Sequence, residues 1–291
     1  MTLCMNLINK AVANLAFRFF YFLVLYFLSK VLMASTLGER YLIKLTPYTQ
    51  QIEYKESENS RIFNQEQGTL NGLKYQLSYL INDWGIELSG DHSFGNLDYV
   101  GQTQLGRTAA TKTNINRDIF QLLLSKELID FSKNDCLACG KISIFTGGKY
   151  DLTHRDILSK GKITGLEETY QISMAELGLT WQVPNLIYVD WMLNISHSQA
   201  FKSSLDINFL SPYDNTKVPL NDVYVNEAEL LISYLFLKKM TIGLKLKYSE
   251  SEIEKSDVFP LYKQQRKSGS FYQPQREIQS ILIGLQLSAD F

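Results

Sequence analysis

Apolar side chains in the last stretch of the chain, residues 277–291, repeat with a period of two. One face of this extended segment carries Ile281, Ile283, Leu285, Leu287, Ala289 and Phe291, whereas the other face is mostly small or polar. A soluble sheet can contain such a strand, but a final strand this apolar would invite aggregation at an exposed edge. The pattern is what a strand needs when it has lipid on one side and water on the other, in a sheet closed into a barrel.

Nine earlier segments show a related alternation, and turn signals separate them. They begin near Tyr41, Leu73, Trp84, Phe120, Ile142, Tyr170, Ile187, Leu230 and Ile242. Short connections between the segments alternate with long ones, which cover about residues 56–68, 96–116, 151–167, 199–222 and 250–275. The sequence therefore predicts an all-β fold: a closed antiparallel transmembrane β-barrel of about ten strands, with long extracellular loops, short periplasmic turns and both termini in the periplasm.

Charged residues inside the predicted strands indicate which face lines the lumen. A Lys or Arg on the lipid face costs about 2–4 kcal/mol near the midplane of the bilayer. We therefore expect strand residues of both signs to face the lumen, namely Glu87, Glu227, Glu229, Lys245 and Lys247. A barrel of this size is close to the width that side chains can fill, so we expect paired charges to plug it and no wide diffusion pore.

The first 34 residues have the pattern of a secretory signal peptide. A start that contains the basic residues Lys10 and Arg18 precedes an apolar run that ends in a small residue, Ala34, which predicts cleavage before Ser35. The alternative is a retained membrane helix, because residues 15–34 are nearly long enough to span a bilayer. After cleavage, residues 35–291 are expected to form the barrel in the outer membrane of a Gram-negative cell.

The composition of residues 35–291 agrees with a single domain of this kind. They hold 26 of the 29 basic residues and all 30 acidic residues, a net charge of −4. A nucleic-acid partner would require a strongly basic face, so none is expected. The chain has 17 Tyr, 16 Phe and 3 Trp, which suits aromatic girdles at the two membrane boundaries. No motif predicts a cofactor.

The only Cys-x-x-Cys pair is formed by Cys136 and Cys139. Such a pair can belong to a redox motif within a βαβ unit or to half of a zinc site. The sequence shows neither the βαβ unit nor a second pair of ligands, so we expect no metal site. A local disulfide in a turn, on the oxidising side of the inner membrane, is the prediction.

Three histidines map to the outer rim of the predicted barrel: His92, His154 and His197. An aspartate beside a histidine can activate water as a general base, and the alternative for each histidine is a solvated side chain. The sequence contains no Gly-x-Ser-x-Gly elbow, no His-Glu-x-x-His helix and no Gly-rich phosphate loop.

The last long loop is basic and aromatic. It contains Lys263, Arg266, Lys267 and Arg276, interleaved with Phe271 and Tyr272. Such a loop can bind the phosphates of lipopolysaccharide or an acidic partner. The alternative is a loop that is merely solvated.

The chain resembles the omptins, a family of outer-membrane surface proteases with ten strands and five tall loops. The resemblance is architectural, and residues 165–170 (GLEETY) with residues 177–181 (LGLTW) look like the start of the sixth omptin strand. The omptin site pairs an Asp-x-Asp motif in the second loop with an Asp-x-His motif in the fourth, with water between them. The corresponding stretches here are Asn96-Leu97-Asp98 and Asp206-Ile207-Asn208, which keep one aspartate each.

These departures limit what the resemblance implies. Asn208 stands at the histidine position, and an amide is no base at neutral pH. His197 would replace that base only if its strand pointed it into the cleft. The final Phe291 resembles the last residue of bacterial outer-membrane barrels, which implies recognition of the closing strand by the barrel-assembly machinery.

Three functions stay open from the sequence. The first is a non-catalytic surface barrel whose loops bind an extracellular protein or serve the envelope, with lipid and lipopolysaccharide around it. The second is an omptin-type hydrolase with an altered aspartate site, for which Asp98 and Asp206 would have to face each other. The third is a narrow channel through the lumen.

Overall fold

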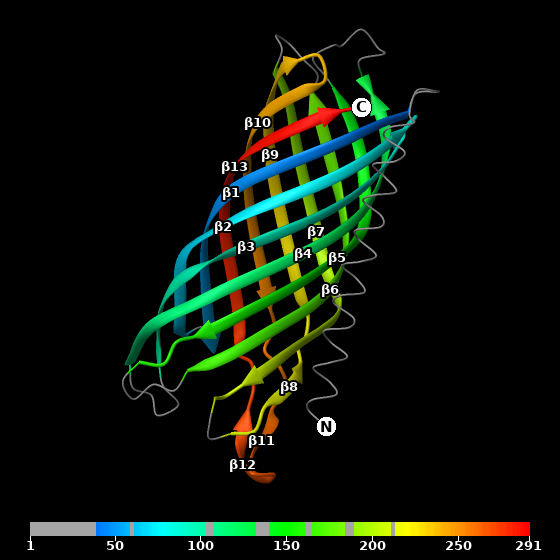
Figure 1. Cartoon of the computed structure of the whole chain (residues 1–291). Helices are drawn as coiled ribbons and strands as arrows, with labels where there is room; N and C mark the ends of the chain where they lie inside the picture. Colours follow the sequence, from blue (N-terminus) through cyan, green and yellow to red (C-terminus); the bar gives the residue numbers. More distant parts are fainter. Residues whose placement is uncertain are drawn as a thin grey trace.

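The computed structural model describes residues 39–58, 61–102, 108–131, 140–160, 165–183, 189–210 and 213–291. Ten long strands form the barrel (Figure 1): β1 (Glu39–Glu58), β2 (Arg61–Ile81), β3 (Trp84–Gln102), β4 (Thr108–Asp130), β5 (Lys141–Ile157), β6 (Leu166–Val183), β7 (Val189–Asn208), β9 (Val223–Leu237), β10 (Met240–Ile253) and β13 (Gln275–Asp290). Three short strands lie at one end: β8 (Thr216–Pro219), β11 (Phe259–Lys263) and β12 (Arg266–Phe271). The predicted leader and the predicted disulfide lie outside the described residues.

Antiparallel pairing runs around the whole ring. Each long strand pairs with the next long strand along the chain, including β6 with β7. The ring closes where β1 pairs with β13, for example at Leu45 opposite Leu287. At the end of this seam the main-chain N–H of Phe291 donates to the carbonyl of Tyr41 at 2.9 Å. The prediction of a closed barrel of ten strands, with the first and last as neighbours, is confirmed.

An apolar belt surrounds the outside of the barrel at the end with the short turns. On β13 the side chains of Ile281, Ile283 and Leu285 are 55%, 50% and 46% exposed, whereas Leu282 and Gly284 between them are buried. An apolar band of this kind suits contact with hydrocarbon. The described residues contain no helix long and apolar enough to cross a membrane.

The three tryptophans mark one edge of the belt. Trp84 follows the tight turn between β2 and β3, and Trp181 and Trp191 flank the connection between β6 and β7. All three rings are about half exposed, and the ammonium of Lys126 lies 5.0 Å from the centroid of the Trp84 ring. Amphipathic rings concentrate at the membrane–water boundary, so this edge is one of the expected aromatic girdles.

The strands are much longer than a membrane crossing requires. Strands β1 to β7 have 17 to 23 residues each, whereas about 9–11 residues cross a bilayer. Much of the sequence expected as long loops is therefore strand. Most of the expected loop over residues 56–68, for example, is strand, because β1 ends at Glu58 and β2 begins at Arg61. The barrel wall continues well beyond the belt, at the end opposite the C-terminus (Figure 1).

The part of the barrel beyond the belt has an apolar interior. One cluster joins β1 to β4 through Ile52, Tyr54, Leu70, Leu97 and Ile115. A larger cluster lies under β8 and β11 and comprises Tyr170, Ile172, Met174, Leu205, Ile207, Phe209, Val218, Leu220, Val223, Val225, Ile253 and Leu261. Strand β8 pairs with the end of β7, and β11 pairs with β12, and β8 and β11 contribute Val218 and Leu261 to the larger cluster.

Candidate functional site

The lumen inside the belt is lined by paired charges. The carboxylate of Glu227 accepts from the ammonium groups of Lys149 and Lys247, both at 2.9 Å, and Glu229 pairs with Lys245 at 3.2 Å. All five residues line one cavity of about 160 Å³. A volume of this size holds a few water molecules.

A third luminal carboxylate belongs to β3. Glu87 accepts from the amide of Gln76 at 2.8 Å and lies 3.7 Å from the ammonium of Lys44. Glu87 lines the same cavity as Glu227, Glu229, Lys245 and Lys247. These are the five residues that the sequence predicted to face the lumen, so that prediction is confirmed. Desolvated charges require such partners, so the pairs explain how charged side chains are accommodated inside the barrel.

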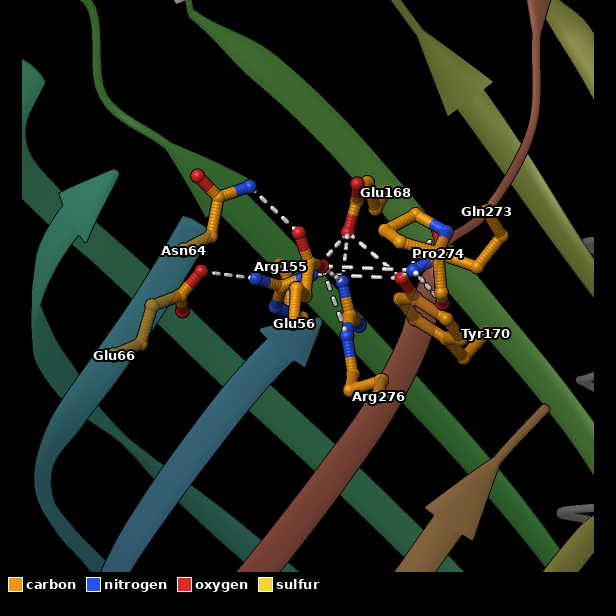
Figure 2. Close-up of polar contacts among 9 residues, drawn as sticks. All are labelled: Glu56, Asn64, Glu66, Arg155, Glu168, Tyr170, Gln273, Pro274 and Arg276. Carbon is orange, nitrogen blue, oxygen red and sulfur yellow. Dashed lines mark hydrogen bonds and ion pairs between the residues drawn. The ribbon is translucent and has the colours of Figure 1, made fainter. Parts of the chain in front are cut away.

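A second polar group, the arginine cluster, lies beyond the belt and crosses the mouth of the barrel. It comprises Glu56 on β1, Glu66 on β2, Arg155 on β5, Glu168 and Tyr170 on β6, and Arg276 on β13 (Figure 2). The sequence neighbours of the cluster members point to the outer face and are polar: Lys55, Gln67, His154, Glu167 and Glu277. Polar residues on the outer face place the cluster outside the membrane-spanning segments.

Arg155 connects three strands within the cluster. Its guanidinium pairs with the carboxylates of both Glu66 and Glu168. The phenol of Tyr170 donates to Glu168 at 3.0 Å, and the guanidinium carbon of Arg155 lies 5.5 Å from the centre of the Tyr54 ring. Only 2% of the Arg155 side chain is exposed, so its charge depends on these partners.

Arg276 completes the crossing from the opposite side of the mouth. Its Nε donates to Glu56 at 3.0 Å, and its Nη2 lies 3.7 Å from Glu168. Its guanidinium carbon lies 4.8 Å from the centre of the Tyr170 ring, which is within cation–π range. Glu168 therefore joins the two arginines, and Figure 2 shows the resulting chain of contacts from β2 to β13.

The pKa values of Glu56 and Glu66 are shifted in opposite directions. Burial raises the pKa of Glu56, but the guanidinium groups of Arg276 and Arg155 outweigh it and lower the pKa to about 2. Burial dominates at Glu66 and raises its pKa in spite of Arg155, and its Oε2 has no hydrogen-bond partner. Three carboxylates, Glu56, Glu66 and Glu168, thus share the two guanidinium groups of Arg155 and Arg276.

The two stretches expected to carry a protease site lie on the outer surface of the barrel. Asn96 and Asp98 on β3 are exposed and alternate with the buried Leu97. Asp206 on β7 accepts from the ammonium of Lys217 at 3.0 Å, and Asn208 donates to Glu167 at 2.7 Å. Strands β4, β5 and β6 separate β3 from β7, so the structure does not bring the two stretches together.

The histidines also point outward. His197 is exposed, shares a 2.8 Å hydrogen bond between its Nδ1 and the side-chain oxygen of Asn226, and stacks on Tyr224. His92 lies 2.8 Å from a carboxylate oxygen of Asp118, and the Nδ1 of His154 lies 2.9 Å from the hydroxyl of Thr169. None of these contacts joins a histidine to Asp98 or Asp206.

The predicted basic loop is an ordered hairpin. Lys263, Arg266 and Lys267 are exposed at the tip of the β11–β12 hairpin, the outermost part of the molecule in Figure 1. They make no ion pair within the part of the chain that the structure describes. The sequence identified these cations but gave no signal for the strands that carry them.

The arginine cluster was missed by reasoning from the sequence. Arg276 was counted as part of the basic loop, Arg155 stands in a stretch expected to be loop, and Glu168 directly follows that stretch. The available signal was that apolar positions move to the inward strand face here, so that charges two residues away, such as Glu56 after Ile52 and Tyr54, share that face.

Comparisons with known proteins agree with the architecture. No family model matches the chain, and no curated protein matches it. The solved structure of the outer-membrane protease OmpT from Escherichia coli is similar, with a TM-score of 0.61 and 14% identity over 87% of this chain and 96% of that one. The fold is omptin-like.

Other solved barrels match more loosely. The outer-membrane protein OprG from Pseudomonas aeruginosa has 10% identity and a TM-score of 0.41, over 89% of this chain and 98% of that one. The translocator domain of the autotransporter NalP from Neisseria meningitidis has 9% identity and a TM-score of 0.41, over 94% and 96%. The likeness to OmpT concerns the fold, so the function of this chain has to be argued from its own residues.

Proposed function

We propose that this protein is a closed surface barrel of the Gram-negative outer membrane that neither conducts nor cleaves, and that its outer end is a recognition surface. The observation that carries the proposal is the arginine cluster across the mouth. Arg155 and Arg276 tie β2, β5, β6 and β13 together through shared carboxylates, and an apolar core lies beside them. Below them, the lumen is lined by charge pairs.

The proposed location follows from the outer surface. The belt would contact lipid, and Lys112 and Lys202, which are exposed beyond it, would reach the phosphates of lipopolysaccharide. The closing strand with Phe291 would be the segment that the assembly machinery recognises. The leader over residues 1–34 would direct export.

An omptin-type hydrolase with an altered aspartate site is the second candidate, and the fold likeness to OmpT favours it. Its site would need the carboxylates of Asp98 and Asp206 in one cleft with a base. Their outward positions on well-separated strands favour the non-catalytic barrel instead.

Two measurements test the proposal. Purified barrel in planar lipid bilayers should show no stepwise conductance, because paired side chains occupy the lumen. Intact cells that display the protein should leave dibasic peptides uncut. Conductance steps from the unmodified barrel would favour the narrow channel. Peptide cleavage that disappears in Asp206→Ala, but persists in the exposed Asp257→Ala, would favour the hydrolase.

A further inference from the structure

The β11–β12 hairpin, called here the basic hairpin (residues 259–271), contains features that are unfavourable in the free protein. Lys263 and Arg266 are directly opposite each other in the strand register. Like charges at such positions repel and destabilise a strand pair. Lys267 lies one residue further along β12, so three cations gather at one exposed tip.

The turn at the tip is strained as well. Gln264 and Gln265 have φ angles of 50° and 64°, the left-handed region that a two-residue hairpin turn of this type requires. Asn-Gly is the usual pair there, because other residues lose energy in this conformation. Strain of this kind is often found where a segment is held for binding.

Asp214 holds the strained turn in place. Its Oδ1 accepts from the N–H of Gln264 at 3.2 Å, and its Oδ2 accepts from the N–H of Gln265 at 2.9 Å. Its own N–H donates to the carbonyl of Tyr262 at 2.8 Å, on the outer side of β11. The nearby carboxylate therefore bonds the backbone and not the three cations.

Within the described residues, nothing pairs with the outer edge of β12. β11 and β12 form a sheet of two strands, and the segment at Asp214 covers only the β11 side. Residues 266–270 are all exposed, and a Cβ on Gly269 would meet no atom within 4 Å. An interior glycine weakens a strand and leaves its backbone uncovered, which is typical of a place where another backbone approaches.

The base of the basic hairpin is firmly anchored. Leu261 is 4% exposed within the larger apolar cluster, and the rings of Phe209 and Phe271 pack edge to face with centroids 6.1 Å apart. Ser256 and Gln273 close the neck through two hydrogen bonds, at 2.9 Å and 2.8 Å. An edge held in this way loses little entropy when a partner binds.

We propose that β12 accepts an extended, acidic segment of another protein as an additional antiparallel or parallel strand, with its carboxylates bridging Lys263 and Arg266, which share one face of the hairpin. The inference rests on the proposed surface function and names its partner class. Main-chain hydrogen bonds would supply affinity, and the cations would supply the choice of partner. A second copy of this hairpin is disfavoured because its cations would repel these.

An acidic protein fits better than lipopolysaccharide for a geometric reason. The tip projects furthest from the belt, whereas lipid phosphates lie at the membrane surface (Figure 1). A phosphate also needs no open strand edge, which is the second feature of this site.

Fluorescence anisotropy tests the proposal with a defined probe. The probe is a labelled ten-residue peptide of alternating Glu and Thr, titrated with the barrel in phosphatidylcholine nanodiscs. Replacing Lys263, Arg266 and Lys267 by Gln should weaken binding by at least about tenfold, and a Gln-for-Glu peptide should bind as weakly. Lys238→Gln with Lys239→Gln, in the turn at the opposite end of the barrel, is the control and should bind normally.

Two methylated peptides test the mode of binding on the unmodified protein. Only alternate N–H groups of an added strand face the edge that it joins. N-methylation of one alternate set should therefore abolish binding, whereas methylation of the other set should leave it intact. Equal binding of both methylated peptides would overturn strand addition. Absence of peptide binding, or binding only to discs that contain lipopolysaccharide, would overturn the proposed partner, and neither result would alter the conductance and cleavage tests above.

Discussion

At the scale of single residues, the arginine cluster shows why buried charges occur in groups. Arg155 and Arg276 are each 2% exposed, and a lone guanidinium in such a place would lose its hydration without compensation. Each is held by carboxylates from strands far apart in the sequence and by an aromatic face. The cluster therefore fixes the relative positions of β1, β2, β5, β6 and β13 more than it adds net stability.

Removing one carboxylate should be costly. Glu56→Gln would leave Arg276 with a neutral partner inside the cluster, and breaking a buried pair costs about 3–5 kcal/mol. Glu58→Gln is the matched control, because Glu58 pairs with Lys255 in an exposed setting that is worth about 0–1 kcal/mol. Urea unfolding in lipid vesicles measures both. Equal losses for the two variants would show that the cluster does not hold the mouth together.

The cluster also predicts a pH dependence. The pKa of Glu56 lies near 2 in the folded protein against an ordinary 4.5, so its ionised form favours folding. That stabilisation is complete above about pH 4.5 and is lost as the pH falls towards 2. Glu66 acts in the opposite sense, because its raised pKa means that protonation favours the folded state. The melting temperature should therefore fall below pH 4.5, and in Glu56→Gln this fall should be smaller. An unchanged pH profile in the variant would contradict the assignment.

At the scale of strands, the sequence predicted the membrane-spanning parts and failed beyond them for one physical reason. In β2, apolar Leu73 and Leu77 face outward within the belt, but Leu70 faces inward beyond it. The medium outside changes from lipid to water, so the apolar residues move to the other face. The outward-apolar pattern ends there, and the continuing strand looks like a loop in the sequence.

The other features that the sequence did not predict depend on tertiary structure. An extra residue in β7, Phe201, forms a bulge opposite Ser173 and Met174 and shifts the parity of the residues that follow. This shift turns Leu205 and Ile207 inward, and Asp206 outward. No local pattern announces a bulge, so the direction of Asp206 was not predictable from the sequence.

The basic hairpin yields a prediction about Asp214. Asp214→Ala should free the two turn N–H groups and raise local opening of the tip, which contains three trypsin sites, Lys263, Arg266 and Lys267. Limited trypsin digestion followed by mass spectrometry should show faster cleavage there, with the barrel intact. Asp257→Ala, an exposed carboxylate near the base of the hairpin, should cleave at the rate of the unmodified protein. No acceleration in Asp214→Ala would mean that the turn is held by something else.

At the scale of the whole molecule, one barrel has two sections with opposite distributions of polar and apolar side chains. Within the belt the outside is apolar and the inside is charged, as at Leu285 outside and Lys245 inside. Beyond it the inside is apolar or ion-paired and the outside is polar, as in a soluble barrel. One continuous set of strands thus anchors in a bilayer and carries a rigid, water-exposed platform above it.

This division predicts that the cost of a charge depends on its depth. Leu285 and Gln279 lie on the same outer face of β13, six residues apart, with Leu285 inside the belt and Gln279 beyond it. Leu285→Arg should cost about 2–4 kcal/mol because the guanidinium would face hydrocarbon. Gln279→Arg should cost no more than about 1 kcal/mol. Its cross-strand neighbours, Glu53 and Glu250, carry the opposite charge. Urea titrations of both variants in lipid vesicles, read by the heat-modifiable mobility of the folded barrel, measure the difference. If both substitutions cost the same, the outward face of β13 does not contact lipid at Leu285, and the apolar belt has to be explained by contact with protein instead.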